Sequence, residues 1–307
     1  MTLNSANRGW RIAAWASGYT LAIAGGVAWL VAPVQSAKAD RGIDIVQTAV
    51  AVDAVHPVVA ASAVNFAEGT TFKGTVVYTD EFKTLAPLVK KGQADVKDPA
   101  VCAAADVPNE EMVVNADNKG VADVFIYLSK APAGYKVAKP EGDVVFDQKG
   151  CQFLPHSLCV QIGQTVTVLS DDPIPHNTHT NPIRNTGFNQ TIAPNDRTGV
   201  ALKYTKAEKT PIEVKCDFHT WMKAYHLILD HPFMAVTDAD GKFEIKDLPP
   251  GKHEFMVWHS KKGFLDRKYV VDAKAGAATE VTIKYGAKNF MAFDGPRPKS
   301  VVVSLSK

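Results

Sequence analysis

Short apolar and β-branched runs, separated by turn residues, recur along most of this chain. They predict strands at residues 73–78, 121–128, 144–146, 157–162, 164–169, 224–229, 234–237, 242–245, 252–258, 268–272, 279–285 and 301–305. Turn sequences such as Asp238-Ala239-Asp240-Gly241 and Leu248-Pro249-Pro250-Gly251 lie between them. Many short strands with Gly/Pro turns and little helix predict an all-β protein built from antiparallel sandwiches.

Two segments lack this pattern. Residues 44–67 are rich in Ala and Val without a clear period, and we interpret them as a linker or a loosely packed first strand. Residues 80–108 are polar and contain three prolines and a glycine, which predicts a long loop with a helical turn near residues 82–91.

The N-terminus has the pattern of an export signal. Arg8 and Arg11 precede a mostly apolar stretch at residues 12–34, and Ala37-Lys38-Ala39 matches a small-x-small cleavage site. The apolar stretch is long for a signal peptide, so the segment is either cleaved or retained as a membrane anchor. Both alternatives place residues from about 40 onward in the periplasm or outside the cell.

Composition and charge narrow the function. Hydrophobic residues make up 46% and charged residues 21% of the 307, which is ordinary for a folded globular protein. The formal net charge is +2, but residues 1–39 contain three basic and no acidic side chains, so the remainder is close to neutral. No basic stripe with interleaved aromatics is present, and we expect no nucleic-acid partner.

The strongest chemical signal is the segment from Cys216 to Met222. It reads Cys216-x2-His219-x2-Met222, and His176 in an Asp172-x3-His176-Asn177 segment supplies a second imidazole. Two His, one Cys and a weak axial Met form the ligand set of an electron-transfer copper site. We therefore predict one Cu(I)/Cu(II) ion held by these four side chains, with Asn177 and Asp217 supporting the ligands.

The other histidines have less specific interpretations. His179 lies three residues after His176, so on one strand the two side chains point to opposite faces. This favours a surface or supporting role for His179, with a further metal ligand as the alternative. For His156, His226, His231 and His259, we expect ordinary hydrogen bonding at strand ends and loops, and the alternative is a second metal site or a tuned port for electrons.

Four cysteines are present, at positions 102, 151, 159 and 216. In an exported protein, two disulfides with three possible connectivities are the default expectation. If Cys216 binds metal, we favour a Cys102–Cys151 disulfide with Cys159 as a buried free thiol in a strand.

Part of the chain resembles the cupredoxin family. Phe153-x-Pro155, Val160-x2-Gly163-Gln164-Thr165-Val166 and the His176 segment follow the plastocyanin-like pattern, and the spacing of the Cys216 loop is similar to that of amicyanin. The resemblance covers roughly residues 145–230. It implies a Greek-key sandwich with blue copper, in which His219 or a surface neighbour is the port for electrons.

A second, shorter resemblance involves the segments on either side. Gly74-x-Val76, residues 119–124 and residues 237–253 resemble the carboxypeptidase-regulatory, transthyretin-like sandwich. We therefore expect a signal or anchor at 1–39, a linker at 40–70, a discontinuous sandwich at 71–142 and 231–286, an inserted or fused copper domain at 143–230, and an extension at 287–307.

These observations predict an exported type 1 copper protein that carries single electrons between a redox-protein donor and acceptor. No nucleophile elbow, phosphate loop or dinucleotide fingerprint indicates an enzyme. The alternatives are an envelope binding or scaffold protein for carbohydrate or protein, with structural or no copper, and periplasmic copper storage or delivery. The amicyanin-like spacing also suggests a subunit of an amine-oxidising system.

Overall fold

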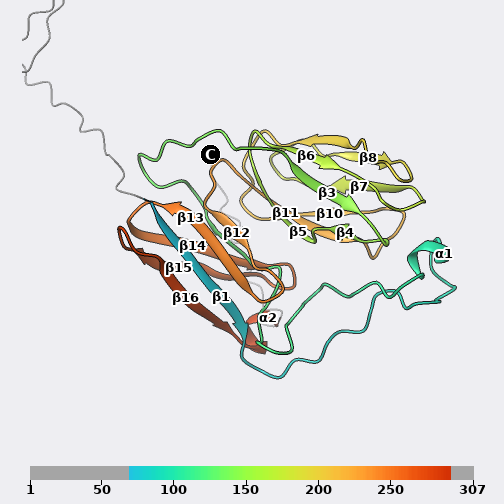
Figure 1. Cartoon of the computed structure of the whole chain (residues 1–307), viewed down its shortest axis with the longest axis horizontal. Helices are drawn as coiled ribbons and strands as arrows, with labels where there is room; N and C mark the ends of the chain where they lie inside the picture. Colours follow the sequence, from blue (N-terminus) through green and yellow to red (C-terminus); the bar gives the residue numbers. More distant parts are fainter. Residues whose placement is uncertain (1–68, 292–307) are drawn as a thin grey trace, which may run out of the picture. The chain divides into compact units, whose positions relative to one another are not determined.

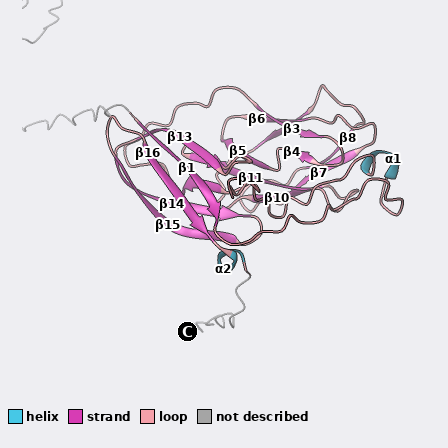
Figure 2. Cartoon of the chain, turned by 60° about the horizontal axis from the view of Figure 1, so that its bottom comes forward, coloured by secondary structure: helices cyan, strands magenta, loops and turns pink. Residues whose placement is uncertain are grey.

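The computed structural model describes residues 69–291, and in this part the protein is all-β. Figures 1 and 2 show strands throughout, with two short helices, α1 (Pro99–Cys102) and α2 (Ala287–Phe290). The predicted signal or anchor at 1–39, nearly all of the linker at 40–70 and the strand at 301–305 lie outside the described residues. Among the described residues, no helix is long and apolar enough to cross a membrane.

One pair of sheets forms what we call the flanking sandwich, because its strands come from both sides of the copper motif in the sequence. The first sheet has the order β13-β1-β16 and the second β12-β2-β14-β15. The strands are β1 (Thr70–Tyr78), β2 (Phe125–Leu128), β12 (Met234–Val236), β13 (Lys242–Leu248), β14 (Gly251–His259), β15 (Gly263–Ala273) and β16 (Thr279–Tyr285).

Alternation along β1 explains how this sandwich closes. Every second side chain from Thr70 to Tyr78 is buried, which is the period of a strand with one face on a core. Phe72 and Val76 pack there against Phe255 and Val257 of the second sheet. The strand β1 pairs antiparallel with β13 and parallel with β16. The first and the last strand of the described residues are therefore neighbours in one sheet.

The short strand β2 is buried on both faces because it contributes to two cores. Ile126 and Leu128 belong to the core of the flanking sandwich. Phe125 and Tyr127, on the other face, pack with Leu227 and Leu229 of the strand β11 (Lys223–Leu229), which belongs to the other pair of sheets. This double burial accounts for a continuous apolar run rather than an alternating one.

The second pair of sheets, here called the central sandwich, carries the copper motif. Its sheets have the orders β5-β11-β10-β7-β8 and β4-β3-β6-β9. The strands are β3 (Val144–Gln148), β4 (Phe153–Leu154), β5 (Ser157–Gln161), β6 (Thr165–Val168), β7 (His176–Thr180), β8 (Asn189–Ile192), β9 (Val200–Lys203), β10 (Ile212–Lys215) and β11 (Lys223–Leu229).

The central sandwich interrupts the flanking one in sequence. The strands β2 and β12 are hydrogen-bonded neighbours, with Ala235 opposite Ile126, although β3 to β11 lie between them along the chain. Each sandwich has its own core cluster, and a third small cluster joins them through β2, β11 and Trp258. The fold is therefore an all-β arrangement in which one sandwich is inserted into the other.

Close backbone packing in the flanking sandwich leaves no room for a side chain at Gly120. A Cβ on Gly120 would lie 2.0 Å from the carbonyl oxygen of Asp240. Two backbone hydrogen bonds beside it, from Val76 to Gly241 and from Val121 to Val76, hold the three segments in contact. The Lys119-Gly120-Val121 sequence is thus explained by close backbone approach.

The long loop before β2 differs from the sequence prediction. Residues 82–91 contain no helical turn, and the helix of this region is α1, at Pro99–Cys102. Pro99 suits the start of α1, because the N–H that proline lacks has no intrahelical partner at a first helical position. The loop runs over the end of the central sandwich that carries the metal motif, and α1 is tied to that end by a disulfide.

Candidate metal centre

Three ligand side chains meet at one end of the central sandwich. His176 is the first residue of β7, Cys216 directly follows β10, and His219 lies in the loop between β10 and β11. The two Nδ1 atoms are 3.0 Å apart, and Cys216 Sγ lies 3.7 Å from His219 Nδ1. All three side chains are buried, and their donor atoms lie within 4.8 Å of one another.

Carboxylates orient both imidazoles. His176 Nε2 lies 2.8 Å from Asp172 Oδ2, and His219 Nε2 lies 3.0 Å from Asp98 Oδ2. A carboxylate accepts hydrogen bonds, so each Nε2 carries the proton and donates it. The Nδ1 of each ring faces Cys216 and is the nitrogen that can bind a metal once its proton is lost.

The loop from Cys216 to Met222 is closed by its own backbone. Cys216 N–H donates to the carbonyl of Met222, and Met222 N–H donates to that of His219. Met222 is 2% exposed and packs in the same core cluster as Cys216. The structure thus brings Met222 to the buried side of the loop, and its role as axial ligand stays a prediction.

Asn177 joins the two ligand-bearing segments. Its side-chain Oδ1 accepts from Asp217 N–H at 2.6 Å, and its Nδ2 donates to Asp217 Oδ2 at 2.9 Å. Asn177 follows His176 and Asp217 follows Cys216, so this reciprocal pair fixes the spacing between two ligands. Both residues predicted to support the ligands therefore lie beside the centre and contact each other.

His179 does not join the ligand group. Its Nδ1 pairs with Asp217 Oδ2 at 2.9 Å, and its side chain is partly exposed. Lys215 adds an ion pair to the same carboxylate. Hydrogen bonds from Lys215, Asn177 and His179 hold the pKa of Asp217 well below its usual range, although burial opposes this slightly.

The surroundings of Cys216 and His176 shift their pKa values toward a thiolate–imidazolium pair in the metal-free site. Burial alone would raise the pKa of Cys216, but hydrogen bonds from His176, His219 and nearby backbone groups lower it to about 6. Burial would lower the pKa of His176, whereas Asp172 and Cys216 raise it to about 9. Cys216 is therefore a thiolate near neutral pH, which is the form that binds metal.

Residues 98–102, which include α1, cover the side of the centre on which the cupredoxin resemblance implies an exposed residue. We call this segment the cap. His219 is fully buried, whereas the sequence predicted that it or a neighbour reaches the surface. Asp98 at the start of α1 covers its Nε2, and the indole of Trp221 packs against its ring at 5.4 Å. The adjacent Phe218, which is 43% exposed, is the neighbour that reaches the surface.

The cap is linked to the sandwich by a disulfide. Cys102 in α1 pairs with Cys151, which precedes β4, and the described cysteines left free are Cys159 and Cys216. Cys159 is partly buried, and desolvation raises its pKa to about 12. Trp221 Nε1 donates to the carbonyl of Cys151 at 3.2 Å, so the cap, disulfide and metal loop form one packed unit.

The donor set fits a copper ion. Two further ligand clusters among residues 69–291 each include a disulfide sulfur, which offers no thiolate, so His176, Cys216 and His219 form the cluster with free donors. Metal–imidazole bonds of about 2.0 Å at tetrahedral angles place two nitrogens of one site about 3.3 Å apart, close to the 3.0 Å observed. One thiolate with two imidazoles suits both Cu(I) and Cu(II).

The remaining histidines have structural environments. The fully buried His226 packs edge-on against Phe146 at 4.5 Å and bonds the Tyr204 hydroxyl at 2.9 Å. Burial lowers its pKa and that of His259, each to about 3. His231 Nδ1 accepts from a nearby backbone N–H. Within the described residues, none of these joins a metal-ligand cluster.

Sequence reasoning missed three residues of this site. Asp98 reaches His219 through the cap, and no local pattern around Asp98 connects it to a residue 121 positions away. Trp221 lies in the metal loop itself, two residues after His219, and packs against its ring. Asp172 was detectable, because the Asp172-x3-His176 spacing places a carboxylate one short turn before the ligand. Asp172 also accepts from the backbone N–H groups of Gly150 and Cys151.

Comparisons with known proteins identify similar solved structures only. Neither the family models nor the curated proteins include a match to this chain. An amicyanin variant in its reduced state is 22% identical, with 35% of this chain and 99% of that chain covered at a TM-score of 0.26. A purple cupredoxin from Nitrosopumilus maritimus is 19% identical over 28% of this chain and all of that chain, at 0.24.

The similarity also extends to an enzyme. A copper-containing nitrite reductase from Thermus scotoductus SA-01 is 18% identical over 32% of this chain at a TM-score of 0.26. The match spans 25% of that chain's length. These structure neighbours are cupredoxins or contain copper, and at these scores the site's own geometry carries the functional argument.

Proposed function

We propose that this chain is an exported mononuclear type 1 copper protein that transfers single electrons between redox-protein partners outside the cytoplasm. The observation that carries the proposal is the buried cluster of one thiolate and two inward-facing Nδ1 atoms. His176, Cys216 and His219 would hold the ion, and Met222 would lie at the axial position. The bound ion would supply one-electron exchange between Cu(I) and Cu(II).

The protein's contribution is to hold the donors still. Asp172 and Asp98 lock the two imidazoles, and the Asn177–Asp217 pair locks the two segments that carry them. A site that needs little rearrangement between oxidation states exchanges electrons quickly. The outer hydrogen bonds therefore support electron transfer more than copper delivery, which requires ligands that open to a recipient.

The compartment proposal has support from the disulfide. Cys102–Cys151 lies beside the metal loop, and such bonds persist in oxidising compartments. This agrees with the export pattern of residues 1–39, whether that segment is removed or retained as an anchor. We further propose that the centre serves as an electron carrier without a substrate reaction of its own.

The test is spectroscopic. Full-length protein is loaded with Cu(II), and its visible and EPR spectra are compared with those of Cys216→Ser and of Cys159→Ser, which removes the other free thiol. We expect an intense thiolate-to-copper band in the wild type and in Cys159→Ser, and none in Cys216→Ser. A wild-type protein without this band, or with copper held equally by Cys216→Ser, would refute the proposal.

A further inference from the structure

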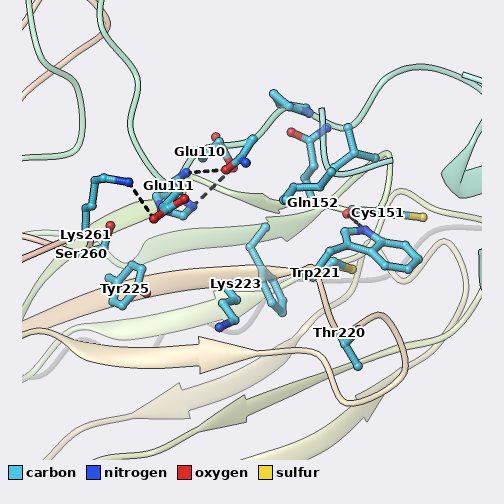
Figure 3. A pocket seen from close by; sticks show the side chains of 17 residues that line it. Glu110, Glu111, Cys151, Gln152, Thr220, Trp221, Lys223, Tyr225, Ser260 and Lys261 are labelled. Carbon is cyan, nitrogen blue, oxygen red and sulfur yellow. Dashed lines mark hydrogen bonds and ion pairs between the residues drawn. The ribbon is translucent and has the colours of Figure 1, made fainter. Parts of the chain in front are cut away.

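A cavity of about 470 Å³ opens beside the candidate metal centre. It is bounded by the long loop around residues 88 and 107–111, by residues 151–156, by residues 220–225 and by residues 260–261. Figure 3 shows Trp221 and Cys151 at one end of this cavity, and Glu110, Glu111 and Lys261 at the other. The volume lies within the range of small-molecule sites.

The first end presents a fixed aromatic wall. Trp221 packs against His219, and its Nε1 is held by the Cys151 carbonyl, so the indole has a defined orientation. Phe153 and Tyr225 also line the cavity, as does Met222. Aromatic faces favour offset or edge contacts with another flat ring, beyond the benefit of burying its area.

The second end is polar but electrically balanced. Glu110 Oε2 lies 3.3 Å from Nδ1 of the buried His156, and Glu111 Oε1 pairs with Lys261 at 2.8 Å. Lys223, the other lysine of the lining, pairs with a carboxylate on β10. A charged ligand would leave one of these groups or its own charge uncompensated on desolvation, so the cavity favours an uncharged ligand.

The chemistry of this polar end also selects a hydrogen-bond donor. A carboxylate has two oxygens and about four acceptor positions and donates nothing when ionised. Glu110 and Glu111 therefore keep acceptor capacity after their ion pairs are made. A hydroxyl group satisfies such an acceptor, and the resulting charge-assisted bond is stronger than a neutral one.

We propose that this cavity is a binding site for a small uncharged phenol of one or two fused rings. The ring lies against Trp221 and the hydroxyl donates to Glu110 or Glu111. The site shares a wall with the metal centre, because Trp221 contacts both His219 and the cavity. Binding depends on the cavity alone and stands apart from the electron-transfer proposal.

The first experiment is calorimetric titration of copper-free, full-length protein with three naphthalene probes. We expect 2-naphthol to bind, 2-methoxynaphthalene to bind about tenfold more weakly because it cannot donate, and anionic 2-naphthoate to bind about tenfold more weakly or not at all. Equal affinity for naphthol and its methyl ether, preference for the anion, or no binding of naphthol would overturn the proposal.

Variants then locate the site. Glu110→Gln or Glu111→Gln, whichever removes the acceptor of the hydroxyl, should weaken naphthol binding about tenfold, whereas Glu244→Gln, which removes a lysine-paired carboxylate on β13, should not. Trp221→Ala should weaken binding through the loss of the aromatic wall. If Trp221→Ala does not fold, the glutamate variants still decide, and naphthol affinities of both Glu110→Gln and Glu111→Gln equal to that of Glu244→Gln would overturn the assignment.

The copper experiment and the naphthol experiment can fail independently. A blue band without naphthol binding removes the phenol site and keeps electron transfer. Naphthol binding without a blue band does the reverse, because the titrations use copper-free protein.

Discussion

The clearest test of how the site is held together is Asp172→Asn. Asp172 is 3% exposed and its carboxylate accepts three hydrogen bonds, from Gly150 N–H at 2.6 Å, Cys151 N–H at 2.8 Å and His176 Nε2 at 2.8 Å. It therefore joins the disulfide loop to a ligand imidazole. An asparagine keeps the shape but replaces one acceptor oxygen by a donor NH₂.

The magnitude follows from this geometry. Oδ1 serves Gly150 and Oδ2 serves both Cys151 and His176, so either orientation of the new amide places its NH₂ against a backbone N–H. An unsatisfied buried donor costs about 1–3 kcal/mol, and a hydrogen bond to a charged group is worth about 1.5–3 kcal/mol. We expect the free energy of unfolding to fall by about 2–4 kcal/mol.

The same change should alter metal binding and the dependence of stability on pH. Loss of an outer hydrogen bond to a ligand typically weakens metal affinity about 10–100-fold. Burial raises the pKa of Asp172, but its hydrogen bonds to His176 and to the backbone outweigh this and lower it. The stabilisation is then present above the unfolded pKa of about 3.9 and lost at lower pH, so the variants should converge in acid.

The assay is urea unfolding of copper-free protein by tryptophan fluorescence, together with copper competition titrations. The control is Asp171→Asn, because Asp171 is the adjacent carboxylate and makes an exposed ion pair with Lys149. Such surface pairs contribute little. A loss for Asp171→Asn equal to that for Asp172→Asn, or no loss for the latter at neutral pH, would refute the reasoning.

Three further changes test other parts of the molecule. Met222→Leu should keep copper bound and shift its reduction potential, as measured by voltammetry, and complete loss of copper would contradict the axial role. His226→Gln should flatten the pH dependence of the free energy of unfolding between about pH 6.5 and 3. Burial lowers the pKa of His226 to about 3, so the wild-type protein loses roughly 1.4 kcal/mol of stability for each pH unit that the pH falls in that window. A slope for the variant like that of the wild type would count against the buried neutral histidine. Gly120→Ala should lower stability by about 1–3 kcal/mol in thermal unfolding, whereas Gly187→Ala, whose new Cβ meets its nearest atom at 3.5 Å, should not, and equal melting temperatures would argue against the close backbone contact.

Apolar periodicity predicted many of the strands that face a core, but it missed β9 and β10, although Leu202, Ile212 and Val214 pack in the core of the central sandwich. The predicted strand at 157–162 corresponds to β5, and that at 224–229 to β11. The strand β7 was missed because its sequence, His176 to Thr180, is entirely polar although four of its five residues are buried. The buried side chains of His176, Asn177 and Thr180 make hydrogen bonds, and hydrophobic patterning does not report those.

The site could be predicted only as far as its local motif extends. Cys216, His219 and Met222 lie close together in the sequence with a characteristic spacing, and His176 lies in the Asp172-x3-His176-Asn177 segment. The cap was not predictable, because Asp98 meets His219 through a long polar loop whose path is set by tertiary contacts. This cap is the reason that His219 itself is buried and that the exposed neighbour is Phe218, a distinction for which the sequence pattern carries no signal.

The insertion of one sandwich into the other also sets an order of assembly. All strands of the central sandwich are complete once residue 229 has been synthesised; α1 precedes them in the chain, and its disulfide partner Cys151 lies between β3 and β4. The flanking sandwich cannot close until β16 pairs with β1, near the end of the described chain. The central sandwich, with its candidate metal centre, can thus fold before the flanking sandwich closes, which shortens the span between β2 and β12 and lowers the entropy cost of joining them.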